Sequence, residues 1–175
     1  MWRALAWLLA ALLVVPVTVR AAEPPSQAAQ AQKALATEPF MRHAAAAIKF
    51  QAASSQLALR KTKADTVQSF AHQMVLDSSV AGMKFRQLLA DAKLPVPRDA
   101  LTGGHKALFD ELSRSPPGKP FAKAYVDAQS TALKEDLEVF QAYARTGDDV
   151  RLKHFAEEMV PLLRGQIDQV GKLRR

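Results

Sequence analysis

The sequence has no cysteine, little glycine and few aromatic residues, and each shortage excludes a class of protein or site. Because there are 0 Cys in 175 residues, disulfides, thiolate catalysis, zinc–thiolate sites and lipidation on a cysteine are excluded. The 7 Gly are scattered, so the chain has no glycine-rich loop of the kind that cradles phosphate groups. Aromatic residues make up 7% of the chain and all apolar residues 49%, so we expect one ordinary domain with a core mainly of Ala, Leu and Val.

The charge of the chain is positive but dispersed. Lys and Arg number 24 and Asp and Glu 17, which gives a net charge of +7. Proteins that read nucleic acids concentrate their basic residues on one face, often between aromatic residues, and this sequence does neither. We therefore expect no nucleic-acid partner. The basic residues are compatible with a weak attraction to an anionic membrane surface, although their plainer role is solubility.

The first residues have the order of a secretory signal peptide. A basic start, Met1 to Arg3, precedes an almost wholly apolar run, and the small residue Ala21 offers a cleavage site. The run is about 16 residues, shorter than the ~20 that cross a bilayer, and an uncleaved N-terminal membrane anchor is the alternative. We expect residues 1–21 to be removed, residues 22–36 to be a flexible spacer, and the mature protein to reside in a bacterial periplasm.

Residues 37–175 have the apolar periodicity of four long helices. We expect these helices over about 37–62, 65–92, 120–145 and 148–175. Thr37, Asp65 and Asp148 are the predicted N-caps, Gln68 completes a capping box with Asp65, and Pro161 is expected to kink the last helix. The residues of the apolar stripes form the predicted core: Phe40, Ala44, Ala47, Ile48, Gln51, Ser55 and Ala58; Val67, Phe70, Ala71, Met74, Ser78, Ala81, Phe85, Leu88 and Leu89; Phe121, Tyr125, Ala128, Ala132, Leu133, Asp136, Leu137 and Phe140; and Leu152, Phe155, Ala156, Met159, Leu163, Gln166, Ile167 and Val170.

An internal repeat and one long connection predict the topology. The pattern Phe-Ala-x-x-Met-Val occurs at 70–75 and again at 155–160, which indicates two copies of one αα-hairpin. Residues 93–118 form the connection between the copies, with prolines near both ends and a short helix expected over 105–112. Two hairpins with short turns and a single crossover predict an all-α, ferritin-like four-helix bundle over 37–175.

Several stretches, taken in order, resemble the bacterial domain of unknown function 4142 family, a secreted ferritin-like group. The resemblance covers roughly residues 38–172 and implies a ferritin-like bundle, export and no assigned reaction. The stretches that carry it are Gln51 with Ser54-Ser55-Gln56-Leu57-Ala58-Leu59; Val67-Gln68-Ser69-Phe70-Ala71-His72-Gln73-Met74-Val75-Leu76-Asp77; Phe121 with Tyr125-Val126-Asp127; and Leu152-Lys153-His154-Phe155-Ala156 with Pro161.

The resemblance also implies which interior positions differ from the family pattern. That pattern has an acidic residue at position 51 and histidine at position 78 and near positions 133 and 166. This chain has Gln51, Ser78, Leu133 and Gln166 instead. If relatives bind a metal at these interior positions, the resemblance implies that the ligand set is lost here.

The residues themselves lead to the same expectation about metals. A di-iron or di-manganese bundle needs inward Glu on two helices and Glu-x-x-His on the other two, and Glu-x-x-His does not occur in this sequence. Asp136 is the one acidic residue that we place inward on a stripe. We therefore expect no metal, no cofactor and no catalytic residue, and we keep Gln51, Ser78, Asp136 and Gln166 as candidate interior polar positions.

The histidines and methionines have plain structural interpretations. We expect His43, His72, His105 and His154 on the surface, with His154 spaced to pair with Glu158 one turn later. Met74 and Met159 lie on core stripes, where methionine commonly fills gaps, so a copper or haem role is not needed to explain them. A Ser-His-Asp arrangement is not supported by these helix positions.

The sequence thus predicts an exported, non-catalytic helical bundle with a binding or structural role in the bacterial envelope, whose partner is an unidentified envelope protein or small ligand. Two alternatives remain open. One is a ferritin-like metal-binding or haem-binding redox protein, which metal content would reveal. The other is a periplasmic chaperone-like module, which requires an apolar cleft between the hairpins.

Overall fold

The computed structural model describes residues 36–174, which form five helices. The predicted signal peptide and residues 22–35 of the predicted spacer lie outside the described residues. The short helix expected over 105–112 is longer than predicted, and the four long helices lie close to their expected ranges. The bounds are Thr37–Lys61 for α2, Asp65–Asp91 for α3, Gly103–Arg114 for α4, Lys119–Thr146 for α5 and Val150–Leu173 for α6.

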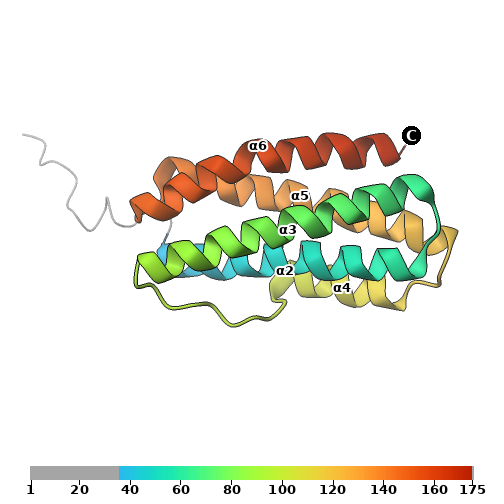
Figure 1. Ribbon diagram of the computed structural model, residues 1–175, viewed down its shortest axis with the longest axis horizontal. Helices are drawn as coiled ribbons and strands as arrows, with labels where there is room; N and C mark the ends of the chain where they lie inside the picture. The colour runs from blue at the N-terminus through green and yellow to red at the C-terminus, as the bar shows by residue number, and fades with distance from the viewer. Residues whose placement is uncertain (1–35, 175) are drawn as a thin grey trace, which may run out of the picture.

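The long helices pair as two hairpins, α2 with α3 and α5 with α6 (Figure 1). The segment with α4 carries the chain from the end of α3 back along the bundle to the opposite end. There the main-chain N–H of Gly118 donates to the carbonyl of Lys61 at 2.7 Å, which places the start of α5 beside the end of α2. Consequently α2 and α5 run antiparallel, and the predicted all-α bundle of two hairpins with one crossover is confirmed.

The main core follows the predicted stripes. Phe70 and Phe155, the repeat equivalents, are both buried. The ring of Phe155 lies 5.2 Å from that of Phe85 and 6.2 Å from that of Phe140, measured between centroids, so it joins both hairpins. Four predicted stripe residues are only half-buried: Ile48, Leu88, Leu137 and Ile167.

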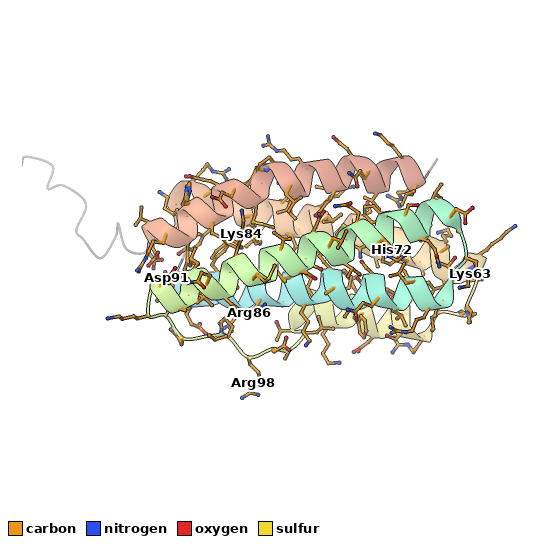
Figure 2. The ribbon with its side chains drawn as sticks, viewed as in Figure 1. Lys63, His72, Lys84, Arg86, Asp91 and Arg98 are labelled. Carbon is orange, nitrogen blue, oxygen red and sulfur yellow. The ribbon has the colours of Figure 1, made fainter. Side chains whose placement is uncertain are left out.

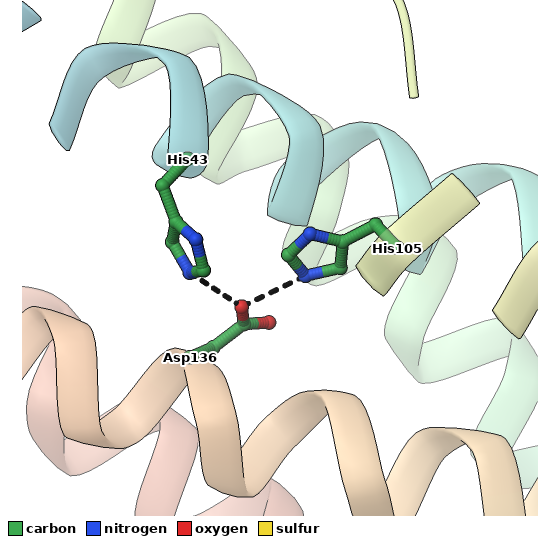
Figure 3. Close-up of side chains that lie close together, drawn as sticks. All are labelled: His43, His105 and Asp136. Atoms are coloured by element: carbon green, nitrogen blue, oxygen red, sulfur yellow. Dashed lines mark hydrogen bonds and ion pairs between the residues drawn. The ribbon is translucent and has the colours of Figure 1, made fainter. Parts of the chain in front are cut away.

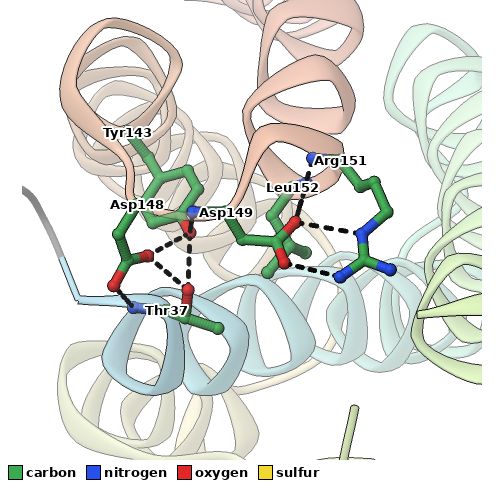
Figure 4. A network of polar contacts seen from close by, with 6 residues as sticks. All are labelled: Thr37, Tyr143, Asp148, Asp149, Arg151 and Leu152. Atoms are coloured by element: carbon green, nitrogen blue, oxygen red, sulfur yellow. Dashed lines mark hydrogen bonds and ion pairs between the residues drawn. The ribbon is translucent and has the colours of Figure 1, made fainter. Parts of the chain in front are cut away.

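The N-terminal caps differ from the predicted ones. Thr37 is the first residue of α2 rather than its cap, and the carboxylate of Asp148 accepts from its main-chain N–H at 3.3 Å (Figure 4). Asp149, not Asp148, caps α6, because it accepts from the main-chain N–H groups of Arg151 and Leu152. The predicted helix boundary at this turn is therefore displaced by one residue.

The predicted capping box of α3 is also wrong. The cap position is Ala64, which makes no side-chain capping bond, and Asp65 is the first helical residue. The Gln68 side chain points back to α2, where its amide donates to the carbonyls of Leu59 at 3.2 Å and Thr62 at 2.7 Å. This amide therefore joins the first hairpin instead of capping its own helix.

The fifth helix, α4, packs on the outer side of α2 and α5 and creates a second, smaller core (Figure 1). Phe50, Ala128 and Ala132 are buried there. Leu101, Leu108 and Phe109, from α4 and the segment before it, pack against this cluster. Phe50 lies off the predicted apolar stripe of α2, because its side chain faces α4 rather than the bundle interior.

The basic side chains are spread over the surface, as the sequence predicts. Lys63, Lys84, Arg86 and Arg98 are spaced along α3 and the segments that flank it, and they do not gather in one place (Figure 2). None of the helices within residues 36–174 is both long enough and apolar enough to span a membrane.

Candidate metal centre

Three side chains from three helices converge where α4 meets the bundle. His43 comes from α2, His105 from α4 and Asp136 from α5 (Figure 3). Nε2 of each histidine lies 2.9 Å from the same carboxylate oxygen, Oδ1 of Asp136. One nitrogen or oxygen from each residue lies within 4.8 Å of the others, so the three present a compact set of two imidazoles and one carboxylate.

The cluster is buried on the α4 side and partly open at His43. Asp136 is 0% exposed and His105 4%, whereas the side chain of His43 keeps 25% of its surface accessible. The imidazole of His105 lies 5.1 Å from that of His43 and 5.6 Å from the ring of Phe50, measured between centroids. His43 is therefore the most accessible of the three side chains.

Asp136 is an anion held by its two histidine neighbours. Burial acts to raise the pKa of this carboxyl, but the hydrogen bonds from His105 and His43 and their charges outweigh burial and lower its pKa below the usual value. Because the carboxylate only accepts, each Nε2 that bonds to it carries a hydrogen. This assignment of protons follows from the geometry and from the ionised state of Asp136.

One atom of the cluster has no partner. Oδ2 of Asp136 is buried and accepts no hydrogen bond from any of the described residues. Leaving a buried charged acceptor unpaired is costly, by about 1–3 kcal/mol or more. The cluster is thus not fully satisfied by its own hydrogen bonds.

The donor types are those of a transition-metal site. Imidazole nitrogen binds Zn, Cu, Fe and Ni, and two imidazoles with one carboxylate leave further coordination positions open. Two ligand atoms that each lie about 2.0–2.1 Å from one ion are separated by about 3 Å, close to the observed separation of Nε2 and Oδ1. Small side-chain rotations would bring all three residues onto one ion once each Nε2 has given up the hydrogen that it donates to Asp136, because a nitrogen that binds a metal carries no hydrogen.

Asp136 is the single predicted interior polar residue that belongs to this cluster. It is inward, as expected, but it is not isolated. The other three predicted positions are buried at 5–6% exposure and have different surroundings. Ser78 donates to the carbonyl of Val75 in its own helix, and Gln166 donates to Asp77 of α3 at 2.8 Å. The amide of Gln51 has no hydrogen-bond partner among the described residues.

The expected surface location holds for two histidines and is wrong for the others. His72 and His154 are exposed, and His154 pairs with Glu158 at 3.2 Å as its spacing predicted. His105 is buried and His43 half-buried, because α4 packs against the face of α2 that carries His43. A signal existed in the sequence: His43 and Phe50 lie two turns apart on one face of α2, and a large apolar residue on an outer face suggests a covering element.

Further buried polar pairs join α2 to α5 two or more helical turns from this cluster. The hydroxyl of Ser55 lies 2.8 Å from that of Tyr125, and the amide of Gln129 donates to the hydroxyl of Ser54 at 2.9 Å. Burial raises the pKa of Tyr125, so its hydroxyl stays neutral. These neutral side chains join the two helices, although the side-chain oxygen of Gln129 is buried with no hydrogen-bond partner among the described residues.

A large hollow lies on the other side of α2. It has a volume of about 730 Å³ and is bounded by α2, α3 and the segment that follows α3. Ile48, Phe85 and Leu89 line its apolar part, and Lys49 and Arg86 lie on its polar part. The hollow belongs to the first hairpin, whereas the chaperone-like alternative calls for a cleft between the hairpins.

Comparison with known proteins agrees with the fold. No curated protein sequence matches the chain. The solved structure of "CopM in the Cu(II)-bound form" is similar to this fold with a TM-score of 0.65 and 12% sequence identity, over 80% of this chain and 96% of that one. The family model for the domain of unknown function DUF4142 matches residues 22–173, nearly the whole of the predicted mature chain, and the chain therefore belongs to the DUF4142 family.

Proposed function

We propose that this protein is an exported, non-catalytic metal-binding bundle that holds one divalent transition-metal ion, with Cu(II) the first to test, through His43, His105 and Asp136. The observation that carries the proposal is the convergence of both Nε2 atoms on one buried carboxylate, at 2.9 Å each. Imidazole and carboxylate are ligands of intermediate and hard character, which favours Cu(II) or Zn(II) over Cu(I).

The electrostatics of the cluster support a cation at this place. The carboxyl of Asp136 remains ionised although it is buried, because hydrogen bonds and charges from the two histidines lower its pKa. Its Oδ2 atom has no hydrogen-bond partner within the described part of the chain. A divalent ion would neutralise the buried carboxylate and give this oxygen a partner.

The choice of copper rests on affinity order and on the structural neighbour. Among divalent first-row ions, Cu(II) binds a given nitrogen and oxygen site most tightly. The neighbour with the same fold is described as Cu(II)-bound, although at 12% identity that likeness concerns the fold and not the ligands. Copper is therefore tested first, with zinc as the redox-inactive comparison.

The proposed site differs from a ferritin-type centre in place and in number of ions. It lies between α2, α4 and α5, on the side that α4 covers. Gln51, Ser78 and Gln166, the other predicted interior polar residues, have neutral side chains and do not belong to this cluster. With one carboxylate in the cluster, the charge suffices for one ion rather than two, so binding of a single ion is the function proposed and no reaction is assigned.

The location proposed for the protein is the bacterial envelope. The predicted signal peptide ends at Ala21, and the family match begins at residue 22, directly after it. The processed protein is accordingly expected to begin at Ala22, which mass spectrometry of the periplasmic fraction would establish. A full-length N-terminus in the membrane fraction would favour the membrane-anchor alternative.

The test is metal titration of the periplasmic protein, purified without a histidine tag. We expect calorimetry and elemental analysis to give about one Cu(II) per chain after dialysis. Electron paramagnetic resonance of the Cu(II) form should carry the signature of two imidazole nitrogens. His43→Ala should abolish tight binding, and its half-exposed position makes it the least disruptive ligand substitution.

His154→Ala is the matched control, because His154 is exposed and pairs with Glu157 and Glu158 on α6 alone. This control should retain the same stoichiometry and affinity. The proposal is overturned if wild-type protein holds no ion after dialysis, or if His43→Ala and Asp136→Asn bind as tightly as wild type. Loss of the ion in His154→Ala alone would instead assign the copper to the surface of α6.

A further inference from the structure

We propose that metal binding and the docking of α4 on the bundle are coupled, so that the ion fastens the N-terminal half of α4 and its loss releases that half. This inference rests on the proposed metal site and adds its regulation. The structural reason is that the three ligands come from α2, α4 and α5, and α4 supplies only His105. Release of α4 from the bundle would remove one ligand of three.

The packing of α4 is sparse. Two of its residues, His105 and Leu112, are fully buried. Leu108 and Phe109 are half-buried against the small cluster around Phe50. By contrast α5 buries eleven residues, from Phe121 to Tyr143. Hydrophobic burial therefore contributes little to the free energy with which α4 docks on the bundle. Polar bonds between α4 and the bundle supply a correspondingly larger share of it.

The two ends of α4 are attached by different groups. At the C-terminal end, Nζ of Lys61 donates to the carbonyls of Ser113 at 2.7 Å and Ser115 at 2.9 Å. At the N-terminal end, the bond of His105 to Asp136 attaches the helix itself, and Lys49 of α2 pairs with Asp99 at 2.8 Å shortly before the helix begins. Occupation of the metal site therefore affects how firmly residues 103–110 are docked on the bundle. Lys61 holds the other end of α4 both with and without the ion.

The first turn of α4 has little local stabilisation. Gly103 begins the helix with a φ of 53°, in the region that glycine adopts readily. Thr102, at the cap position, makes no side-chain hydrogen bond to the first turn. The N-terminal turn thus depends on its contacts with the bundle more than on local capping.

Phe50 connects the metal site to the small core. Its ring lies 5.6 Å from that of His105, between centroids, and the same ring is the centre of the cluster that Phe109 covers. Weakening the cover over Phe50 should therefore weaken metal binding, although Phe109 is not a ligand. By linkage, a metal ion that stabilises the docked helix must bind less tightly when docking is impaired.

The first measurement is hydrogen exchange of the full-length processed protein with and without Cu(II), repeated with Zn(II). At an ion concentration of about 100 times the Kd, a site that requires docked α4 slows opening by up to ~100-fold. We expect at least tenfold slower exchange over 103–110, and a smaller change over 111–118 and throughout α6. Binding of an apolar dye should be higher without the ion, since Phe50 and Phe109 become accessible.

The second measurement is the copper affinity of Phe109→Ala, with Leu76→Ala as the matched control on an exposed part of α3. We expect Phe109→Ala to weaken Cu(II) binding at least fivefold and the control to leave it unchanged. If Cu(II) binds and His43→Ala abolishes it, but exchange over 103–110 and the affinity of Phe109→Ala do not change, the coupling is wrong and the proposed site stands. If wild-type protein binds no ion, both proposals are overturned.

Discussion

Asp148 accepts hydrogen bonds from both the main-chain N–H and the hydroxyl of Thr37, which precedes it by 111 residues (Figure 4). The turn between α5 and α6 thereby caps the first turn of α2, a helix that has no capping side chain of its own. Tyr143 joins the same group, because its hydroxyl lies 3.0 Å from a carboxylate oxygen of Asp148. The start of the first hairpin is therefore fastened to the second.

Asp148→Ala should lower the free energy of unfolding by about 1 kcal/mol, the usual contribution of a helix cap. Thermal or urea unfolding followed by circular dichroism measures this change. Asp168→Ala is the control, because Asp168 is exposed on α6, and it should change stability by less than about 0.5 kcal/mol. Equal effects of the two substitutions would contradict the capping role.

The same carboxylate predicts a pH dependence. Burial acts to raise the pKa of Asp148, but hydrogen bonds from Thr37 and Tyr143 outweigh it, so the pKa lies below its ordinary value of 3.8. A lowered pKa in the folded state means that the ionised cap stabilises the protein above pH 3.8, and that this stabilisation is lost as pH falls through the folded-state pKa. The stability difference between wild type and Asp148→Asn should be constant from pH 5 to 7 and should shrink below pH 3.8. A difference that persists undiminished in acid would show that the charge is not involved.

Gly147 is required by the ring of Tyr143 rather than by its own backbone. Its φ is −60°, which any residue adopts, but an added Cβ would lie 2.5 Å from Tyr143 Cε1. Gly147→Ala should therefore displace a ring that stacks on Phe40 at 3.8 Å, and lower stability by about 1–3 kcal/mol. Gly165→Ala in α6 meets nothing within 4 Å and should instead stabilise the protein by about 0.5–1 kcal/mol. Calorimetric melting of the two variants tests the opposite signs.

The sequence predicted the bundle because its signals are local. Apolar residues at helical spacing define the stripes of α2, α3, α5 and α6, and prolines and glycines mark the connections. The cluster of His43, His105 and Asp136 has no local signal beyond the spacing of His43 and Phe50, since His43 and His105 reach Asp136 from 93 and 31 residues away. Its formation depends on where α4 docks, and the local pattern that predicts a short helix there does not say which side of the bundle the helix covers.

The displaced caps have a related cause. The turn between the second pair of helices contains two adjacent aspartates, Asp148 and Asp149, and either one fits the local pattern of a cap. Which one caps α6 depends on the position of Thr37, and that position is set by the packing of the hairpins. The residues alone predict that a cap lies in this turn, and the tertiary structure selects Asp149.

Phe70 and Phe155 test the predicted repeat. Each is buried in the main core, where Phe70 lies 6.2 Å from the ring of Tyr125 and Phe155 lies 5.2 Å from that of Phe85. Replacing either by Ala should cost about 3–5 kcal/mol, the usual range for a buried aromatic residue. Met83→Ala, at a residue that is 59% exposed, is the control and should change stability by less than about 0.5 kcal/mol. A loss below about 1 kcal/mol for either phenylalanine would place it outside the cooperative core.

Gln51 and Gln166 are two of the predicted interior polar residues, and both are buried; we expect opposite responses when each is replaced by Leu. Both polar atoms of the Gln51 amide are buried without a hydrogen-bond partner among the described residues, an arrangement that costs about 1–3 kcal/mol. Gln51→Leu removes this cost in a side chain of similar size, so the melting temperature should rise. Gln166→Leu removes the bond to Asp77 and should lower it.

The same two variants test where a metal ion binds. Neither glutamine belongs to the cluster of His43, His105 and Asp136, so both variants should retain about one Cu(II) per chain by elemental analysis after dialysis. Gln51, Ser78, Leu133 and Gln166 carry no charge and no imidazole, and two divalent ions there would face mutual repulsion and a desolvation cost that amide oxygens cannot offset. A variant that combines Gln51→Leu with Gln166→Leu gives the opposing outcome. If the wild-type protein carries two tightly held ions and this double variant releases them, Gln51 and Gln166 are ligands, and a ferritin-like redox role becomes the better explanation.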